Sequence, residues 1–204
     1  MTSRHGTVDA VGTVERPPDA ATVELRAIGD GNSASDARAD AREQSAALRD
    51  RLDALQTYRV RAVSIKVEAS GDMFDPVTDA AFQATEQLHV DCAPAAVEAV
   101  VVEATDAGAS VQNVNFGLRA ATRETLTDEA LTAAMERARE KAERLAATEG
   151  LAVAGVHEVT TTDASEGFQG IVEEALEFGE ETNLHPGPIT LSEGVQATYE
   201  LTEA

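Results

Sequence analysis

The stretch ATVELRAIGDGNSASDARADAREQSAALRDRLDALQ, residues 21–56, joins a strand pattern, a glycine turn and a helix pattern in direct succession. Val23, Leu25 and Ala27 alternate with other residues, which is typical of a half-buried strand. Ser33 is suited to cap a helix, with Asp36 three residues later. The helical stripe begins with alanines, so this helix can approach a sheet closely; it comprises Ala34, Ala37, Ala41, Leu48, Leu52 and Leu55.

The chain continues this order of elements outward from residue 56. Alternating patterns predict strands over 60–68, 80–91 and 111–118, and Pro94 opens a second helix that stops at Gly108. Strand, helix, strand, strand, helix, strand over 21–118 is the split βαβ order of ferredoxin-like sheets. We therefore expect an α+β fold with a mixed or antiparallel sheet.

Further elements flank this βαββαβ core. A first strand over 7–16 ends at two prolines and is expected at a sheet edge. Thr127 is expected to cap a long third helix, and strands follow over 151–161 and 189–201. The apolar stripe of that helix is Leu131, Met135, Ala138, Ala142 and Leu145. We expect one domain over 1–204, in which 127–204 supplies this helix and the last strands.

The stretch 163–187, which we name the acidic flap, contains seven acidic and no basic residues. It also contains four large apolar residues that we expect to form a contact between subunits, because an exposed apolar group inside an acidic segment is unusual. The alternative is that the flap folds back on its own core. The residues are Phe168, Ile171, Leu176 and Phe178.

Charge dominates the composition, with 37 acidic against 16 basic residues and a net charge of −21. Only two of the basic residues are lysines, and the acids are spread along the whole chain. This pattern favours adaptation to high salt, where repulsion between like charges is screened. The alternative is an ordinary acidic protein of a mesophile. Without a basic patch, nucleic acid is not an expected partner.

Localisation follows from the hydropathy pattern. No stretch approaches 18 apolar residues, so we expect no membrane span. The N-terminus has no apolar segment of the kind found in signal peptides, so we expect a cytoplasmic protein.

Residues with reactive side chains are few and do not form a recognisable site. His89 and Cys92 would lie on opposite faces of a strand, which is poor geometry for a thiol nucleophile and its base. His5, His157 and His185 are scattered without metal-ligand spacing. The acidic loop over 72–79 does not have the calcium-loop pattern, and the Gly-x-Gly over 29–31 is explained by a tight turn. We expect no catalytic, metal or cofactor site.

The sequence as a whole resembles the SIMPL family, also called the DUF541 or outer-membrane-protein-28-like family. Its acidic composition resembles a halophilic archaeal-type member of that family. The resemblance covers nearly the whole chain in four segments. These are Val11-Gly12-Thr13-Val14 with the strand from Thr22 to Leu25; Val97 to Phe116 around Ala107-Gly108-Ala109; Ala138-Arg139-Glu140-Lys141-Ala142 through Gly150-Leu151; and Pro188-Ile189-Thr190 with Gly194-Val195.

The resemblance implies a mixed α/β fold and a tendency to self-associate, and it carries over no catalytic residues. We therefore expect a non-enzymatic homo-oligomer with a structural or stress-related role. A second hypothesis is a small-molecule binding module with a cleft between the sheet and the acidic flap. A third is a hydrolase or redox enzyme around Cys92, which requires an exposed thiol of low pKa.

Overall fold

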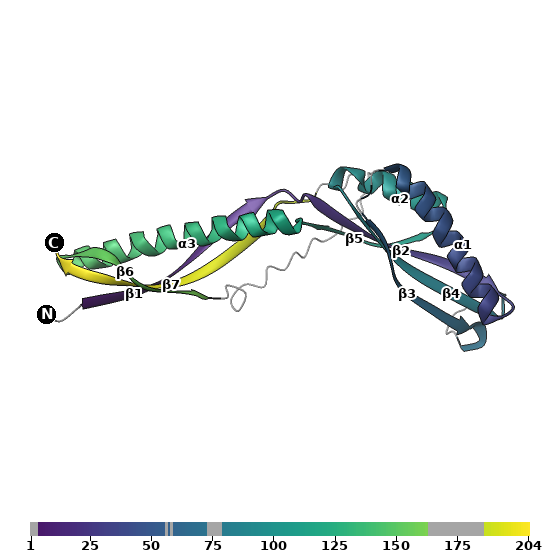
Figure 1. Cartoon of the computed structure of the whole chain (residues 1–204), viewed down its shortest axis with the longest axis horizontal. Coiled ribbons are helices and arrows are strands. Elements are labelled where there is room, and N and C mark those ends of the chain that lie inside the picture. Colours follow the sequence, from purple (N-terminus) through teal and green to yellow (C-terminus); the bar gives the residue numbers. More distant parts are fainter. Residues whose placement is uncertain (1–3, 56, 58, 73–78, 163–185) are drawn as a thin grey trace. The chain divides into compact units, whose positions relative to one another are not determined.

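The computed structural model describes residues 4–55, 57, 59–72, 79–162 and 186–204. The chain divides into two compact units, which we name the central unit (18–118) and the terminal unit (1–17 with 119–204). Each combines an antiparallel sheet with helix (Figure 1), so the predicted α+β fold is confirmed. The expected single domain over 1–204 stays a prediction.

The central unit has the predicted ferredoxin-like order. Its sheet runs β3-β4-β2-β5 with every neighbouring pair antiparallel, and α1 and α2 lie on one face of it (Figure 1). Short 3-10 helices occupy Asp53–Leu55, Ser70–Asp72 and Pro94–Ala96. The main elements are β2 (Ala20–Gly31), α1 (Ala34–Leu52), β3 (Arg59–Ala69), β4 (Phe82–Cys92), α2 (Val97–Asp106) and β5 (Ser110–Gly117).

The core of the central unit lies between the sheet and the helices. Ser33 caps α1 as predicted, since its hydroxyl accepts a hydrogen bond of 3.2 Å from the backbone N–H of Asp36. Ala37 and Ala41 of α1 are fully buried, which lets the helix backbone approach the strands, whereas Ala34 of the predicted stripe is exposed. The largest buried side chains from sheet and helices are Val23, Leu25, Leu48, Leu52, Leu88, Val90, Val97 and Val100.

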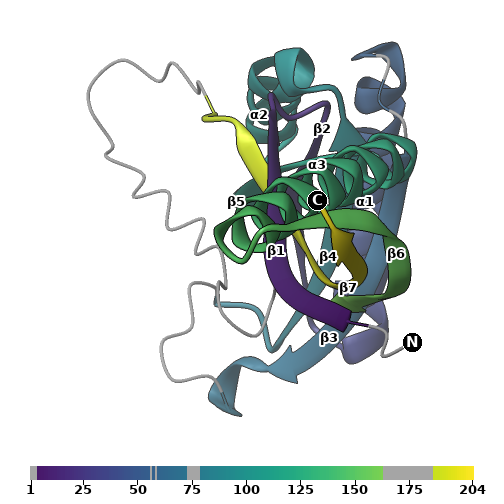
Figure 2. The same cartoon turned by 90° about the vertical axis from the view of Figure 1, so that its left-hand side faces the viewer.

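The terminal unit is built from both ends of the chain. Its sheet has the antiparallel order β1-β7-β6, so the last strand lies between the first and the sixth. The helix α3 runs over one face of this sheet (Figures 1 and 2). The elements are β1 (Arg4–Arg16), α3 (Ala120–Thr148), β6 (Leu151–Thr162) and β7 (Ile189–Glu203).

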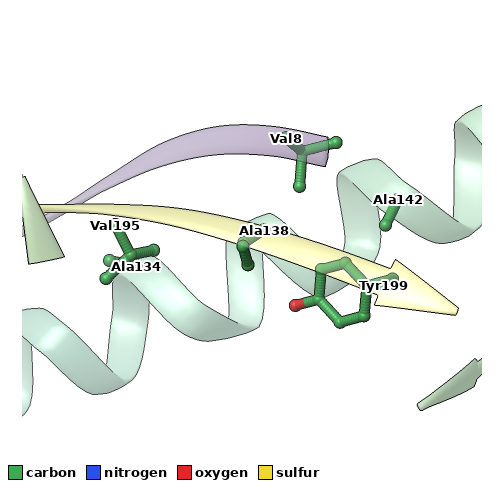
Figure 3. Close-up of a cluster of buried hydrophobic side chains, with 7 residues drawn as sticks. Val8, Ala134, Ala138, Ala142, Val195 and Tyr199 are labelled. Atoms are coloured by element: carbon green, nitrogen blue, oxygen red, sulfur yellow. The ribbon is translucent and has the colours of Figure 1, made fainter. Parts of the chain in front are cut away.

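The core of the terminal unit is made largely of small side chains. Tyr199 is the bulky member of this cluster, and it fills the space between β7 and α3 (Figure 3). Leu131, Met135 and Val153 pack against this cluster while remaining partly exposed. The cluster consists of Val8, Ala134, Ala138, Ala142, Val195, Ala197 and Tyr199.

The predicted start of the third helix is wrong. The helix α3 begins at Ala120 and not after Thr127, and its N-cap residue Arg119 makes no side-chain capping hydrogen bond. Residues 120–126 contain no glycine or proline, and Leu126 at their end is buried in the core. Burial of this first part of the helix outweighs the capping preference of Thr127, because tertiary packing supplies most helix stability.

The predicted apolar stripe of α3 is only partly correct. Ala138 and Ala142 are buried, but Leu145 is 54% exposed. The helix presents a row of small residues to the sheet, where the backbones come close together, and its larger apolar residues flank the contact. The buried row is Leu126, Ala130, Ala134, Ala138, Ala142 and Ala146.

Candidate functional site

The face of the terminal sheet that does not contact α3 carries paired polar side chains. Alternate residues of a strand point to opposite faces, and Val8 and Tyr199 point toward α3. Their neighbours therefore form cross-strand hydrogen bonds on the other face. These join Thr7 to Thr198 at 2.9 Å, Asp9 to Gln196 at 2.8 Å and Thr13 to Ser192 at 3.1 Å.

One end of this polar face brings together three potential metal ligands. His5 of β1 lies directly opposite Glu200 of β7 in the strand register. On β6 the register shifts between Val156 and Glu158, which leaves His157 in a β-bulge beside β7. A bulge re-aims the side chain of its extra residue. We name His5, His157 and Glu200 the two-histidine cluster.

The two-histidine cluster is compact and exposed to solvent. Nδ1 of His157 lies 3.6 Å from Oε1 of Glu200, and the rings of His5 and His157 are 4.5 Å apart with planes tilted by 37°. One donor atom from each residue lies within 4.8 Å of the other two. Two imidazoles and a carboxylate in this arrangement can hold a transition-metal ion.

The sequence contained no local signal for this cluster. His5 and His157 lie far apart in the chain, and their spacing alone predicts no metal site. They meet because β7 pairs with β1 on one side and with β6 on the other. Only a prediction of that pairing and of the bulge could have placed the two imidazoles together.

The structure argues against nucleophilic chemistry at Cys92. Its side chain is 0% exposed, and burial, with a smaller effect of the Asp91 charge, raises the pKa of the thiol. A thiolate is the reactive form of cysteine, so both effects oppose reactivity. His89 lies on the opposite face of β4, as predicted, since it pairs with Glu24 and Arg61 rather than with the buried row. The hypothesis of an enzyme around Cys92 therefore fails its own criterion.

The Gly-x-Gly over 29–31 serves helix packing and not a turn. Both glycines lie inside β2, and a Cβ at Gly29 would collide with the backbone of Ala37 and Ala41 in α1. A Cβ at Gly31 would collide with the backbone N of Ala37. The turn itself follows at residues 32 and 33. The prediction of a tight turn over 29–31 is thus wrong, because β2 continues to Gly31.

The acidic flap remains without a structural description. Its predicted contact residues Phe168, Ile171, Leu176 and Phe178 lie outside the described residues, as does most of the acidic loop over 72–79. The binding cleft expected between the sheet and the acidic flap therefore stays a prediction, because the structure does not describe the flap residues that would line it. The described part of the terminal unit has an apolar cavity of about 100 Å³ between Val8, Ala146 and Leu201. Drug-sized ligands usually occupy about 300 Å³ or more.

The hydroxyl group of Tyr199 is the polar side-chain group in the hydrophobic cluster of the terminal unit. It is buried and has no hydrogen-bond partner among the residues that the structure describes. Burial raises the pKa of Tyr199, with a lowering effect of Arg139 and a raising effect of Glu143. The pKa of this phenol is higher in the folded than in the unfolded protein. The free energy of unfolding is therefore unaffected by this group below about pH 10 and falls as the pH rises above that value, because the unfolded chain then releases the proton more readily.

Tyr199→Phe is expected to leave stability at pH 7 unchanged or raise it by up to about 1 kcal/mol, because an unpaired buried hydroxyl is removed. Above about pH 10 the variant should lose less stability than the wild type. Urea unfolding of both proteins at pH 7 and above about pH 10 measures the difference in stability. The other tyrosine, Tyr58, is present in both proteins, so its titration does not contribute to this difference. A variant less stable by more than about 1 kcal/mol at pH 7 would show that the hydroxyl has a partner.

Helices of the described residues are all too short or too polar to span a bilayer.

Comparison with curated proteins found no match. A family model does match residues 7–199, and its description is SIMPL, a protein of unknown function (DUF541). This match covers almost the whole chain and parts of both units. Of the two-histidine cluster, only His157 lies inside the matched residues, while His5 and Glu200 lie just outside them. The chain therefore belongs to the SIMPL family.

Proposed function

We propose that this SIMPL protein is a non-enzymatic, self-associating protein with a structural role, and that β3 is one of its contact surfaces. The single observation that carries the proposal is the state of β3 at the edge of the central sheet. β3 is 11 residues long and pairs only with β4, so one side of its backbone has no neighbouring strand among the described residues. Such an edge is a template for pairing with another chain.

The side chains of β3 support a protein contact. Val63, Ile65 and Val67 are exposed, and Val63 is 53% exposed. Ile65 and Val67 pair with Glu86 and Ala84 on the face of β4 that α1 covers, but α1 leaves the edge strand accessible. Exposed β-branched residues on an uncovered edge are typical of an interaction surface.

Charge indicates a second copy of this chain as the partner. β3 carries three basic residues (Arg59, Arg61, Lys66) against one acidic residue, Glu68, and so has a formal charge of +2. The chain as a whole carries −21. Arg61 is paired with Asp91 and Lys66 with Glu68, so β3 has little free charge but also lacks the acidic excess of the rest of the chain. This lowers the electrostatic repulsion that β3 would meet at the acidic surface of another copy.

Val63→Glu is expected to reduce the oligomer to the monomer mass of 21.4 kDa, because it places an acidic group on the basic apolar edge. Val102→Glu is the matched control, since Val102 lies on α2 with 52% exposure. Mass is measured by light scattering in about 1 M KCl, where nonspecific repulsion is screened.

The outcomes separate the proposal from its alternatives. A monomeric wild type would contradict self-association. An oligomer that survives Val63→Glu, or that dissociates equally in Val102→Glu, would exclude β3 as the contact. The acidic flap is the other proposed contact, and it is tested by replacing Phe168 and Phe178 with Ser. Dissociation in that double variant alone would place the contact at the flap.

A further inference from the structure

We propose that the two-histidine cluster binds one divalent transition-metal ion, with Zn²⁺ as the reference metal. The ligands are one imidazole nitrogen each from His5 and His157 and a carboxylate oxygen from Glu200. This inference stands on the geometry of the terminal sheet and does not depend on self-association through β3.

The backbone fixes the three ligands on adjacent strands. Glu200 lies on the middle strand β7, with His5 opposite on β1 and Gly155 opposite on β6. The bulge places His157 two residues beyond Gly155 on the same side. Because neighbouring strands lie about 4.8 Å apart, three side chains in one row can converge on a single ion.

The distances are close to those of a bound site. At metal–ligand lengths of about 2.0–2.1 Å, two ligands of a tetrahedral ion are separated by roughly 3.3 Å. The His157 to Glu200 separation is already 3.6 Å, and all donor atoms lie within 4.8 Å. All three side chains are exposed, which leaves room for them to rotate toward a common ion.

The donor set selects the class of metal. Imidazole nitrogens suit Zn²⁺, Cu²⁺, Ni²⁺ and Co²⁺, whereas Mg²⁺ and Ca²⁺ prefer sets made only of oxygen ligands. Three protein ligands leave a fourth position for water in a tetrahedral site. The net charge of −21 further favours a cation at the surface of this chain.

The test is calorimetric titration of ZnCl₂ into tag-free full-length protein. About 1 M KCl screens diffuse attraction to the acidic surface, so that the remaining binding reports a defined site. We expect one Zn²⁺ per chain, and binding weakened at least about tenfold in His5→Ala and in His157→Ala, since each removes one of three ligands. Glu200→Gln, which keeps the side-chain shape, should also weaken binding. Mg²⁺ in large excess should not compete.

His89→Ala is the matched control, because His89 lies on β4 of the central unit and is not a member of the two-histidine cluster. It should bind Zn²⁺ like the wild type, and circular dichroism should show all variants folded. Absence of binding in the wild type would overturn the proposal. So would equal affinities in the wild type and both terminal-sheet histidine variants, because the ion would then be held elsewhere.

Discussion

Replacing Gly12 by alanine is expected to lower the free energy of unfolding of the terminal unit by at least about 3 kcal/mol. Gly12 lies on β1 where α3 crosses the sheet, and a Cβ there would overlap the backbone carbonyl oxygen of Ala130 and crowd the backbone N of Ala134. Backbone atoms of a packed helix cannot rotate away as a flexible side chain can. The helix must shift, and this opens gaps in a core that already consists of small residues.

Gly155→Ala is the matched control, because Gly155 also lies in a strand of the terminal sheet but has open space where a Cβ would be. Its effect should stay within about 0.5 kcal/mol. Urea unfolding gives the free energies, and amide hydrogen exchange of α3 peptides shows whether the loss is located at this contact. Equal stabilities of the two variants would show that α3 does not approach β1 as closely as the structure has it.

The central unit could be predicted from sequence because its signals are local. Alternation in β2, the Ser33 cap and the alanine-led stripe of α1 each lie within one element, and together they gave the correct order of elements. The strand order β3-β4-β2-β5 then follows from the known connectivity of split βαβ units. The start of α3 was missed because Leu126 is held by tertiary packing, which a capping rule does not detect.

The candidate site could not be predicted, because it depends on strand pairing across the whole chain. No residue near His5 indicates that Glu200 lies opposite it, and nothing near His157 indicates that a bulge re-aims its side chain. The exposure of β3 is equally non-local. Its alternating pattern predicted a strand correctly, but only the position at the sheet edge shows that Val63 and Ile65 remain uncovered.

The buried carboxylate of Glu86 should make the central unit sensitive to the loss of one cation. Glu86 is 7% exposed on the face of β4 that α1 covers, and Nη2 of Arg49 donates a hydrogen bond of 3.1 Å to Oε1. Its Oε2 is buried without a hydrogen-bond partner among the described residues. Removing Arg49 therefore leaves a nearly buried carboxylate without its ion-pair partner. Removing Glu86 leaves a guanidinium that can reach water, since the Arg49 side chain is 37% exposed.

Arg49→Met is accordingly expected to cost about 2–4 kcal/mol of unfolding free energy, and Glu86→Leu clearly less. The double variant should recover to within about 1 kcal/mol of the wild type, because both charges are then replaced by apolar groups of similar size. Urea unfolding of the four proteins completes a double-mutant cycle. A double variant as unstable as Arg49→Met would mean that the cost comes from lost packing of the arginine stem and not from the stranded charge. A larger loss of unfolding free energy in Arg49→Met than in Glu86→Leu would show that the cost comes from a buried, unpaired carboxylate. An ion pair on the surface would lose little stability when either of its two residues is replaced.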